Sequence, residues 1–441
     1  MIFIQKNSLR NCSFIIKNRQ SMQLRWKFTF IGICIAFLLW GQSNDPDAYL
    51  TLGIEYRPRT ELRYGYRKLP TVNAQPAFFT SHRARLNLGY ESEKINFFLS
   101  VQDIRLWGEE ATRDRLGELQ LFEFYVMPQL NDHWSMKIGR QRLSFDDERF
   151  FAQNDWRQTS GKHDGINIIY RSPSIQFDWF TAFNQSTMGN FGTNYQPGFE
   201  GYKFLMAHLM TWDINSKSTL TSTIFADGYQ GTTPVQKTFV KSTIGLKFKQ
   251  AMGSKTSFAA SLFSQNGKLP SGQKIRAWFY DIELLQPISP NYQLRAGLQY
   301  FSGGNSPTDD FSNSFLAQYG AFHKFNGRMD YTAKTVDTYN HESLSNPYII
   351  QDLQLNDRVK LSFETHLLGT QNYFYALEND LRCLWKVNAW TQLEIAYMNL
   401  SSNEKINQLP TGNPSNGRKM GHFFYVQALW KNPVRKIINL F

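Results

Sequence analysis

The stretch LTLGIEYRPRTELRY, residues 50–64, places two kinds of side chain at alternate positions. One set is apolar or aromatic and comprises Leu50, Leu52, Ile54, Tyr56, Leu62 and Tyr64. The other set contains charged residues, which are Glu55, Arg57, Arg59, Glu61 and Arg63. Alternation with a period of two indicates a β-strand whose two faces meet different surroundings. A lipid-facing outside and a wet lumen produce this strong contrast, so the stretch predicts a strand of a transmembrane barrel.

Similar alternation recurs along the rest of the chain. Each candidate segment has about ten residues, the length that crosses a membrane when a strand is tilted. Together with the first stretch there are 18 candidates. The other segments are 80–90, 95–106, 118–127, 134–143, 165–171, 175–183, 204–214, 219–226, 237–249, 256–264, 276–285, 292–301, 348–355, 358–367, 375–386, 391–400 and 421–431.

The joints between these segments alternate in length. Short joints, such as 131–132 and 388–389, are followed by long links, such as 145–163 and 303–347. Bacterial outer-membrane barrels have short periplasmic turns and long outer loops, and their strand number is even. The sequence therefore predicts an all-β fold: a transmembrane antiparallel β-barrel of about 18 strands in the cell outer membrane, with both termini on the periplasmic side.

Residues 1–43 have the features of a secretory signal peptide. The run FTFIGICIAFLLW, residues 28–40, carries no charge, follows Arg25 and Lys27, and is followed by small polar residues. This run is shorter than the ~20 apolar residues that a membrane-spanning helix needs. We expect residues 1–43 to be a signal peptide with an N-terminal over-extension, Met22 being the true start. Residues 44–441 are then a single outer-membrane barrel domain.

Composition excludes several other classes of protein. Charged residues make up 19% of the chain, below the ~25% of typical soluble domains, which argues against a disordered protein. Six basic residues of the leader reduce the formal net charge from +12 to +6 when they are removed. Cys383 is then the single cysteine, so neither a disulfide nor a cysteine metal cluster is expected. The sequence contains no HExxH helix, no GxSxG elbow and no complete P-loop. It therefore predicts no enzyme activity.

Residues 136–170, MKIGRQRLSFDDERFFAQNDWRQTSGKHDGINIIY, resemble the alginate-export family of outer-membrane barrels. The resemblance extends to SVQDIRLWG at 100–108, and to FSGGNSPTDDF and HKFNGRMD within 300–330. It implies an 18-stranded monomeric barrel with an Arg- and Lys-lined lumen that passes an anionic polysaccharide. Some family members fill the lumen from below with a long late periplasmic turn. The joint at Asn388 is too short for that, so gating is expected from the outer loops.

Projecting the alternation inward, together with the family-like motifs, predicts the residues that line a substrate path. Guanidinium groups match carboxylates in pairs of hydrogen bonds, which suits uronate sugars. The other interpretation is that these charges pair across strands and keep a wet interior rigid. A one-residue bulge near 136–170 would exchange Arg140 with Gln141 on the inner face. The predicted lining residues are Arg57, Arg59, Glu61, Arg63, Arg83, Arg85, Asp103, Arg105, Glu123, Arg140, Arg149, Lys241, Arg295, Arg358, Lys360, Glu364 and Arg382.

The longest link, 303–347, is too apolar to remain solvated as a coil, because it holds several Phe, Leu and Tyr residues. We expect it to fold inward as a constriction or lid, with His323, Lys324 and Arg328 facing the substrate path. The other interpretation is a loop that packs on its neighbours above the rim.

The leading functional hypothesis is a porin-like channel for an anionic polysaccharide such as alginate or its oligosaccharides. A general or sugar-uptake porin is the second hypothesis, and a surface adhesin barrel is the third. The expected partners are the anionic polysaccharide or oligosaccharide, outer-membrane lipid and periplasmic export components. Nucleic acid binding is not expected, and the sequence predicts no cofactor and no metal site.

Overall fold

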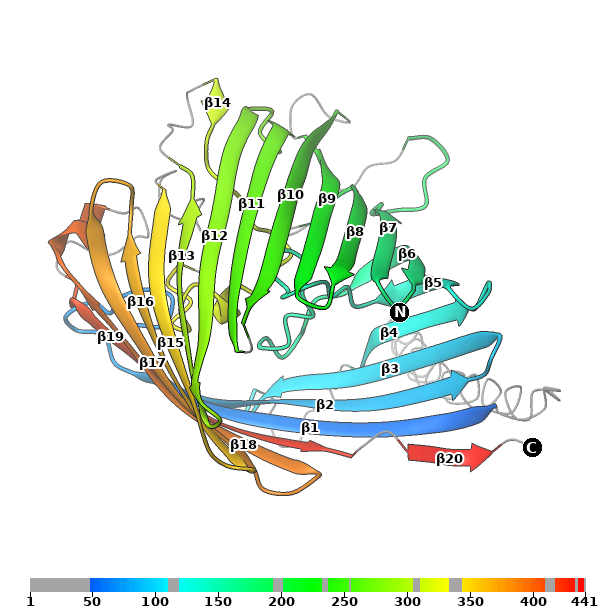
Figure 1. The fold of residues 1–441 in the computed structure, drawn as a ribbon, viewed down its shortest axis with the longest axis horizontal. Helices are drawn as coiled ribbons and strands as arrows, with labels where there is room; N and C mark the ends of the chain where they lie inside the picture. The colour runs from blue at the N-terminus through cyan, green and yellow to red at the C-terminus, as the bar shows by residue number, and fades with distance from the viewer. Residues whose placement is uncertain are drawn as a thin grey trace, which may run out of the picture.

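The computed structural model describes residues 48–109, 119–192, 201–231, 237–253, 255–303, 310–332, 343–408, 417–432 and 435–439 (Figure 1). The predicted signal peptide, residues 1–43, lies outside this range. Within the described ranges, no helix is both long enough and apolar enough to cross a membrane.

Eighteen antiparallel strands form a closed barrel, which confirms the predicted fold class. Each strand pairs with its neighbours along the chain. The strands are β1 (Tyr49–Tyr64), β2 (Ala77–Glu91), β3 (Ile95–Leu106), β4 (Gln120–Pro128), β5 (Trp134–Gln141), β6 (His163–Arg171), β7 (Ile175–Phe183), β8 (Phe204–Asn215), β9 (Ser218–Gln230), β10 (Thr238–Met252), β11 (Thr256–Lys268), β12 (Lys274–Ser289), β13 (Tyr292–Phe301), β15 (Leu344–Asn356), β16 (Val359–Gly369), β17 (Phe374–Lys386), β18 (Thr391–Ser402) and β19 (Met420–Lys431).

The first and last barrel strands close the sheet. β1 pairs with β2 along its whole length, and its second half pairs with β19, for example Thr60 with Val426. Closure leaves no exposed edge on the barrel, which is the condition for a sheet to lie in lipid. Large apolar side chains such as Ile244, Leu262 and Trp278 are exposed on the outer face.

The chain continues past β19 into one more strand that the alternation did not predict. β20 (Arg435–Asn439) pairs with the first residues of β1, and Figure 1 shows it beside β1 near the C-terminus. Between β19 and β20, the Asn432 side chain accepts a hydrogen bond of 2.5 Å from the backbone N–H of Ile54. β20 follows the last of the 18 predicted segments, 421–431. It completes the pairing of β1, whose first residues extend beyond the end of β19.

Short turns gather at one end of the barrel and long links at the other, as the sequence predicts. Two of the long links fold into the lumen: the β5–β6 loop (142–162) and the β13–β15 loop, of which residues 310–332 are described. The β13–β15 loop contains the short strand β14 (Phe311–Ser312) and the 3-10 turn η1 (Phe322–Lys324). A second 3-10 turn, η3 (Glu404–Gln408), follows β18.

The hydrophobic core lies inside the barrel, where these loops meet the inner wall. Phe150 and Phe151 of the β5–β6 loop and Phe315 of the β13–β15 loop are buried. The Phe150 ring lies 4.3 Å from that of Phe263 on β11, and the Phe315 ring lies 5.6 Å from that of Phe279 on β12. Inside the lumen, the apolar residues of both loops are therefore removed from water, whereas above the rim they would be exposed to it.

Candidate functional site

Four arginines project from β1 and β2 into the lumen and are covered by the β5–β6 loop. Arg57 stands opposite Arg83 in the strand pairing, and Arg59 and Arg85 follow on the same face. All four are buried. Like charges on adjacent strands repel unless other groups neutralise them, so the partners of this arginine cluster decide its chemistry.

Those partners come from the wall and from the β5–β6 loop. Arg83 donates to a Glu55 carboxylate oxygen at 2.8 Å and lies 3.0 Å from a carboxylate oxygen of Asp155. Arg57 donates to the backbone carbonyl of Asp155 and to the side chain of Gln158. Burial raises the pKa of Asp155, but the guanidinium groups of Arg83 and Arg57 outweigh this and hold it below its ordinary range. The carboxylate is therefore ionised and ties the loop to the cluster.

The β13–β15 loop is attached to the opposite wall. The backbone of Leu316 exchanges two hydrogen bonds with the Gln265 side chain on β11, at 2.8 and 2.7 Å. Tyr319 donates to the Asp227 carboxylate at 3.0 Å. Farther along, the backbone N–H of Met329 donates to a Glu378 carboxylate oxygen at 2.6 Å. These bonds satisfy backbone groups that burial removes from water.

The two inward loops also hold each other. Ala152 donates a backbone hydrogen bond to the carbonyl of Tyr319 at 3.0 Å, and Ala321 donates to that of Glu148 at 3.0 Å. The Arg149 guanidinium lies 3.6 Å from the centroid of the Phe325 ring. The loops therefore form one packed unit across the lumen.

A buried hydrogen-bonded pair of titratable side chains lies at this junction. His323 donates from Nδ1 to Asp330 at 2.7 Å, and Tyr66 also donates to this carboxylate. Burial raises the pKa of Asp330, but His323, Tyr66 and Arg67 outweigh it and lower the pKa to about 2. Burial lowers the pKa of His323 below its ordinary value, despite the attraction of Asp330.

A chamber of about 620 Å³ lies between these loops and the short-turn end of the barrel. Its lining includes residues of both loops, of β8 to β13 and of β15 to β17. More basic than acidic side chains face it. The bases are Arg149, Lys247, Lys249, Arg295, Lys324, Arg328 and Arg382, and the acids are Asp146, Asp147, Asp281, Glu283 and Glu364.

Two further chambers lie toward the long-loop end. One, of about 540 Å³, is lined by Arg59, Arg63, Arg67 and Arg157, with Glu61 as the acid. The other, of about 320 Å³, is lined by Arg140, Arg157, Lys162 and His163, with Asp164 as the acid. Neither shares a lining residue with the larger chamber. The two inward loops therefore lie between the chambers of the two ends.

Most of the residues that the sequence projects inward are on the inner face or in the inward loops. Glu61 accepts from both Arg59 and Arg63, and Glu123 accepts from Arg142. Lys241 lies 3.3 Å from Asp227, and Arg149 lies 3.0 Å from Asp281. Arg295 and Lys360 both pair with Asp352, and Glu364 pairs with Arg328 and Arg382. The structure thus brings together charges whose pairing the sequence left open.

Four of the projected residues lie neither on the inner face of a strand nor in an inward loop. Asp103 and Arg105 stand opposite Ala84 and His82, so they share the outward face and pair with each other at 2.9 Å.

The other two are Arg140 and Arg358. β5 pairs with β6 without a bulge, so Arg140 shares the face of Trp134 and Ile138, although it also borders the chamber of about 320 Å³. Gln141 is buried on the inner face of β5, whereas Arg140 is more exposed and pairs with Asp164. Arg358 is exposed in the short β15–β16 turn.

Sequence reasoning did not identify the residues that engage the arginine cluster. Asp155, Gln158 and Ser160 all lie within the family-like stretch, but nothing in their local pattern indicates that they fold back onto β1 and β2. Their one signal is that the stretch is polar in a link too long for a simple turn.

The family model described as alginate export matches residues 48–372. The outer-membrane protein opdK of Pseudomonas aeruginosa is similar in structure, with a TM-score of 0.59 and 9% identity over 87% of this chain and 98% of that one. OccAB1 of Acinetobacter baumannii gives 0.59 and 10% identity over 87% and 96%. OprD of P. aeruginosa gives 0.55 and 11% over 90% and 97%. No curated protein sequence matches the chain. At these identities the likeness establishes the fold, that of an outer-membrane β-barrel.

Proposed function

The chain belongs to the alginate-export family of outer-membrane barrels, and from that premise we propose that it passes an anionic polysaccharide, such as alginate or its oligosaccharides, through a basic lumen. The observation that carries the proposal is the charge of the three chambers. In each of them basic side chains outnumber acidic ones. A lumen with low-dielectric walls concentrates this field and raises the local concentration of anions.

Only some of the bases are available to a solute. The four arginines of β1 and β2 are engaged by the wall and the β5–β6 loop. By contrast, within the described part of the chain, Arg157, Lys162 and Lys249 take part in no ion pair, although each lines a chamber. We assign the first contact with uronate carboxylates to these three. The paired arginines become accessible when the β5–β6 loop moves.

The acids beside these bases fit a conducting role. Asp146 and Asp147 accept from Lys247 at 2.9 and 2.7 Å on the chamber side of the β5–β6 loop. A polyanion would have to compete with these two carboxylates for Lys247, because the positive charge of the lysine is already neutralised. Conduction requires binding that is weak enough for release, and paired charges weaken binding in this way.

The size of the chambers favours a second candidate function. A chamber of about 620 Å³ with no lining residue in common with the outer chambers holds a short solute rather than a continuous polymer. In that case the chain is a porin for small anionic or neutral solutes.

Planar bilayer recordings of the purified barrel test the proposal. At low salt we expect anion selectivity, and we expect added oligouronate to block the current at lower concentration than a neutral oligosaccharide of equal length. Cation selectivity would contradict the basic conduit. Anion selectivity with equal block by both sugars would favour the small-solute porin.

A further inference from the structure

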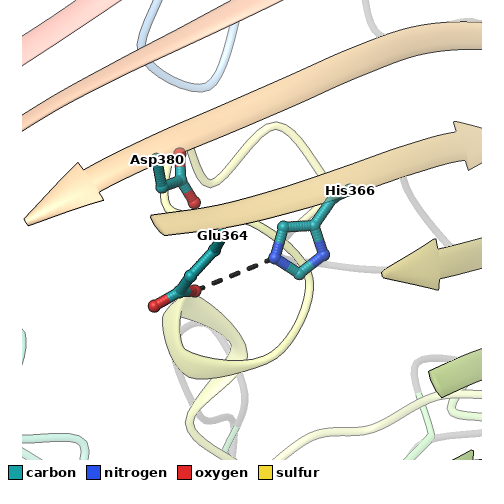
Figure 2. A group of neighbouring side chains, drawn as sticks. All are labelled: Glu364, His366 and Asp380. Atoms are coloured by element: carbon teal, nitrogen blue, oxygen red, sulfur yellow. Dashed lines mark ion pairs between the residues drawn. The ribbon is translucent and has the colours of Figure 1, made fainter. Parts of the chain in front are cut away.

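Four side chains of β16 and β17 form a compact group on the inner wall. Glu364 stands directly opposite Asp380, and His366 stands directly opposite Glu378. Residues two apart on a strand share a face, so all four project toward the β13–β15 loop. Figure 2 shows Glu364 and His366 on one strand and Asp380 on its neighbour. One ligand atom from each of these three lies within 4.8 Å of the others.

Three members of the group, Asp380, Glu378 and His366, are each held by one atom and leave another without a hydrogen-bond partner. Asp380 accepts from the backbone N–H of Arg328 through Oδ2 at 3.0 Å, whereas its Oδ1 has no hydrogen-bond partner. Glu378 accepts from Met329 through Oε1, whereas its Oε2 has none. Both side chains are fully buried. A buried carboxylate oxygen without a partner is costly.

His366 likewise has one ring nitrogen with a hydrogen-bond partner and one without. The Asn346 side chain donates from Nδ2 to the carbonyl of Phe325, so its Oδ1 is the acceptor for His366 Nδ1, at 3.1 Å. This bond places the proton on Nδ1 and leaves a lone pair on Nε2, which is buried and has no hydrogen-bond partner. A histidine oriented in this way through its other nitrogen is the usual arrangement of a metal ligand.

Glu364 completes the set. Its Oε1 accepts from Arg328 and Arg382 at 3.1 and 3.0 Å, and its Oε2 lies 3.8 Å from His366 Nε2. Two ligands of a tetrahedral Zn²⁺ are ~3.4 Å apart, so the two atoms need to approach by only a few tenths of an ångström.

The charge of the network also favours a cation. Glu364, Glu378, Asp380 and Glu394 supply four carboxylates, whereas Arg328 and Arg382 supply two guanidinium groups. One divalent cation would balance the difference. The donor set mixes an imidazole nitrogen with carboxylate oxygens, which suits a first-row transition ion better than Ca²⁺ or Mg²⁺.

We propose that Glu364, His366 and Asp380, with Glu378 beside them, bind a divalent transition cation, for which Zn²⁺ is the probe. The ion links the barrel wall to the inward loop, because Asp380 and Glu378 hold the backbone of Arg328 and Met329 through their other oxygens. Its binding therefore strengthens the attachment of the β13–β15 loop. The site is independent of what the channel transports.

Elemental analysis and calorimetry of the folded barrel in detergent test this proposal. After removal of metal with a chelator and dialysis against Zn²⁺, we expect one tightly bound Zn²⁺ per chain. His366→Ala and the nearly isosteric Asp380→Asn should each abolish this binding. Asn346→Ala, which frees the imidazole, should weaken it by roughly 10- to 100-fold. His422→Ala is the matched control, because His422 lies on β19 and bonds to Tyr397 instead.

Folding of each variant is checked by its heat-dependent migration in gel electrophoresis. A second measurement follows amide hydrogen exchange at Arg328 and Met329, which Zn²⁺ should slow in the unmodified protein and in His422→Ala. The proposal is overturned if the unmodified barrel retains no Zn²⁺ after dialysis. It is equally overturned if folded Asp380→Asn binds Zn²⁺ as tightly as the unmodified protein, because the ion would then be held elsewhere.

Discussion

The indole of Trp156 stacks on the imidazole of His323, with ring centroids 3.8 Å apart and planes inclined by 6°. The two residues belong to different inward loops and are far apart in the sequence. The guanidinium carbon of Arg59 lies 3.8 Å from the Trp156 ring centroid as well. One aromatic ring therefore connects the arginine cluster of β1 with the β13–β15 loop, and the two loops are expected to move together.

Replacing Trp156 by alanine should loosen this junction and raise single-channel conductance. The variant removes a stacking contact and a cation–π contact, worth about 0.5–1.5 kcal/mol and about 0.5–2 kcal/mol. Conductance in planar bilayers measures the effect. Trp278→Ala on the outward face is the control and should leave conductance unchanged. Equal conductance of Trp156→Ala and the unmodified barrel would remove the junction from any gating role.

Gly320→Ala should separate the β5–β6 loop from the β13–β15 loop through a steric clash. A Cβ at Gly320 would lie 1.9 Å from the carbonyl oxygen of Arg149, so the two backbones could not keep their present distance. We expect higher conductance and faster proteolysis of the β13–β15 loop. In Gly189→Ala, the added Cβ would meet its nearest atom at 3.4 Å, so this control should behave as the unmodified protein. A Gly320→Ala barrel with unchanged proteolysis would contradict the close packing of the loops.

Arg83→Gln should lower the stability of the barrel rather than merely its selectivity. Arg83 is 0% exposed, and its loss leaves the buried Glu55 carboxylate without the cation it pairs with, whereas Asp155 keeps Arg57 and Arg85. Breaking a buried ion pair costs about 3–5 kcal/mol. The free energy of unfolding in urea with detergent measures the change. Lys419→Gln is the control, because Lys419 pairs with Glu404 in an exposed position and should hardly change stability. Similar losses of unfolding free energy in both variants would contradict the expected difference between a buried and an exposed ion pair.

Anion selectivity should depend on the unpaired bases. Arg157→Gln combined with Lys162→Gln removes two positive charges from the outer chambers, and we expect the reversal potential in a salt gradient to shift toward zero. The shift should shrink as salt rises, because the Debye length falls from about 10 Å at 0.1 M. Stability should hardly change, since neither residue takes part in an ion pair within the described residues. Selectivity that is unaltered in this folded double variant would contradict the assignment.

Acidic pH should open the junction between the two inward loops. Burial keeps the pKa of His323 below 6.5, whereas an exposed His323 in an opened loop would regain its ordinary value. Opening is therefore favoured as the pH falls below about 6.5, because the open form binds a proton that the closed form resists. Asp330 acts in the same direction at lower pH: its contribution is complete above about 3.8 and is lost as the pH falls toward about 2. Arg59 and Arg328, which also face His323, add to the cost of charging it.

Conductance between about pH 7 and pH 5 measures this response. It should rise in the unmodified protein. His323→Gln, which cannot be charged, should respond less. An identical rise in His323→Gln would assign the response to other groups.

How far the charged residues could be placed from sequence differs from strand to strand. On β1 the period of two correctly separates Arg57 and Glu61 from the lipid-facing residues. On β3 the projection of charged residues into the lumen is wrong, because Asp103 and Arg105 continue the outward face of Phe97 and Leu99 beyond the apolar band. A charge near the rim can face outward, where it meets polar surroundings rather than hydrocarbon. Alternation alone does not show at which depth the lipid ends.

Local patterns in the sequence were sufficient to predict the 18 barrel strands, the alternation of short and long connections and the family. These patterns are which face of a strand is apolar, and how many residues connect it to the next. The partners of the inner charges, by contrast, depend on how the chain folds. Asp155 reaches Arg83 across the lumen, and the register of β16 with β17 brings Glu364, His366 and Asp380 together. Electrostatic partners are chosen by distance in space, which loop folding and strand register set and which no local pattern records.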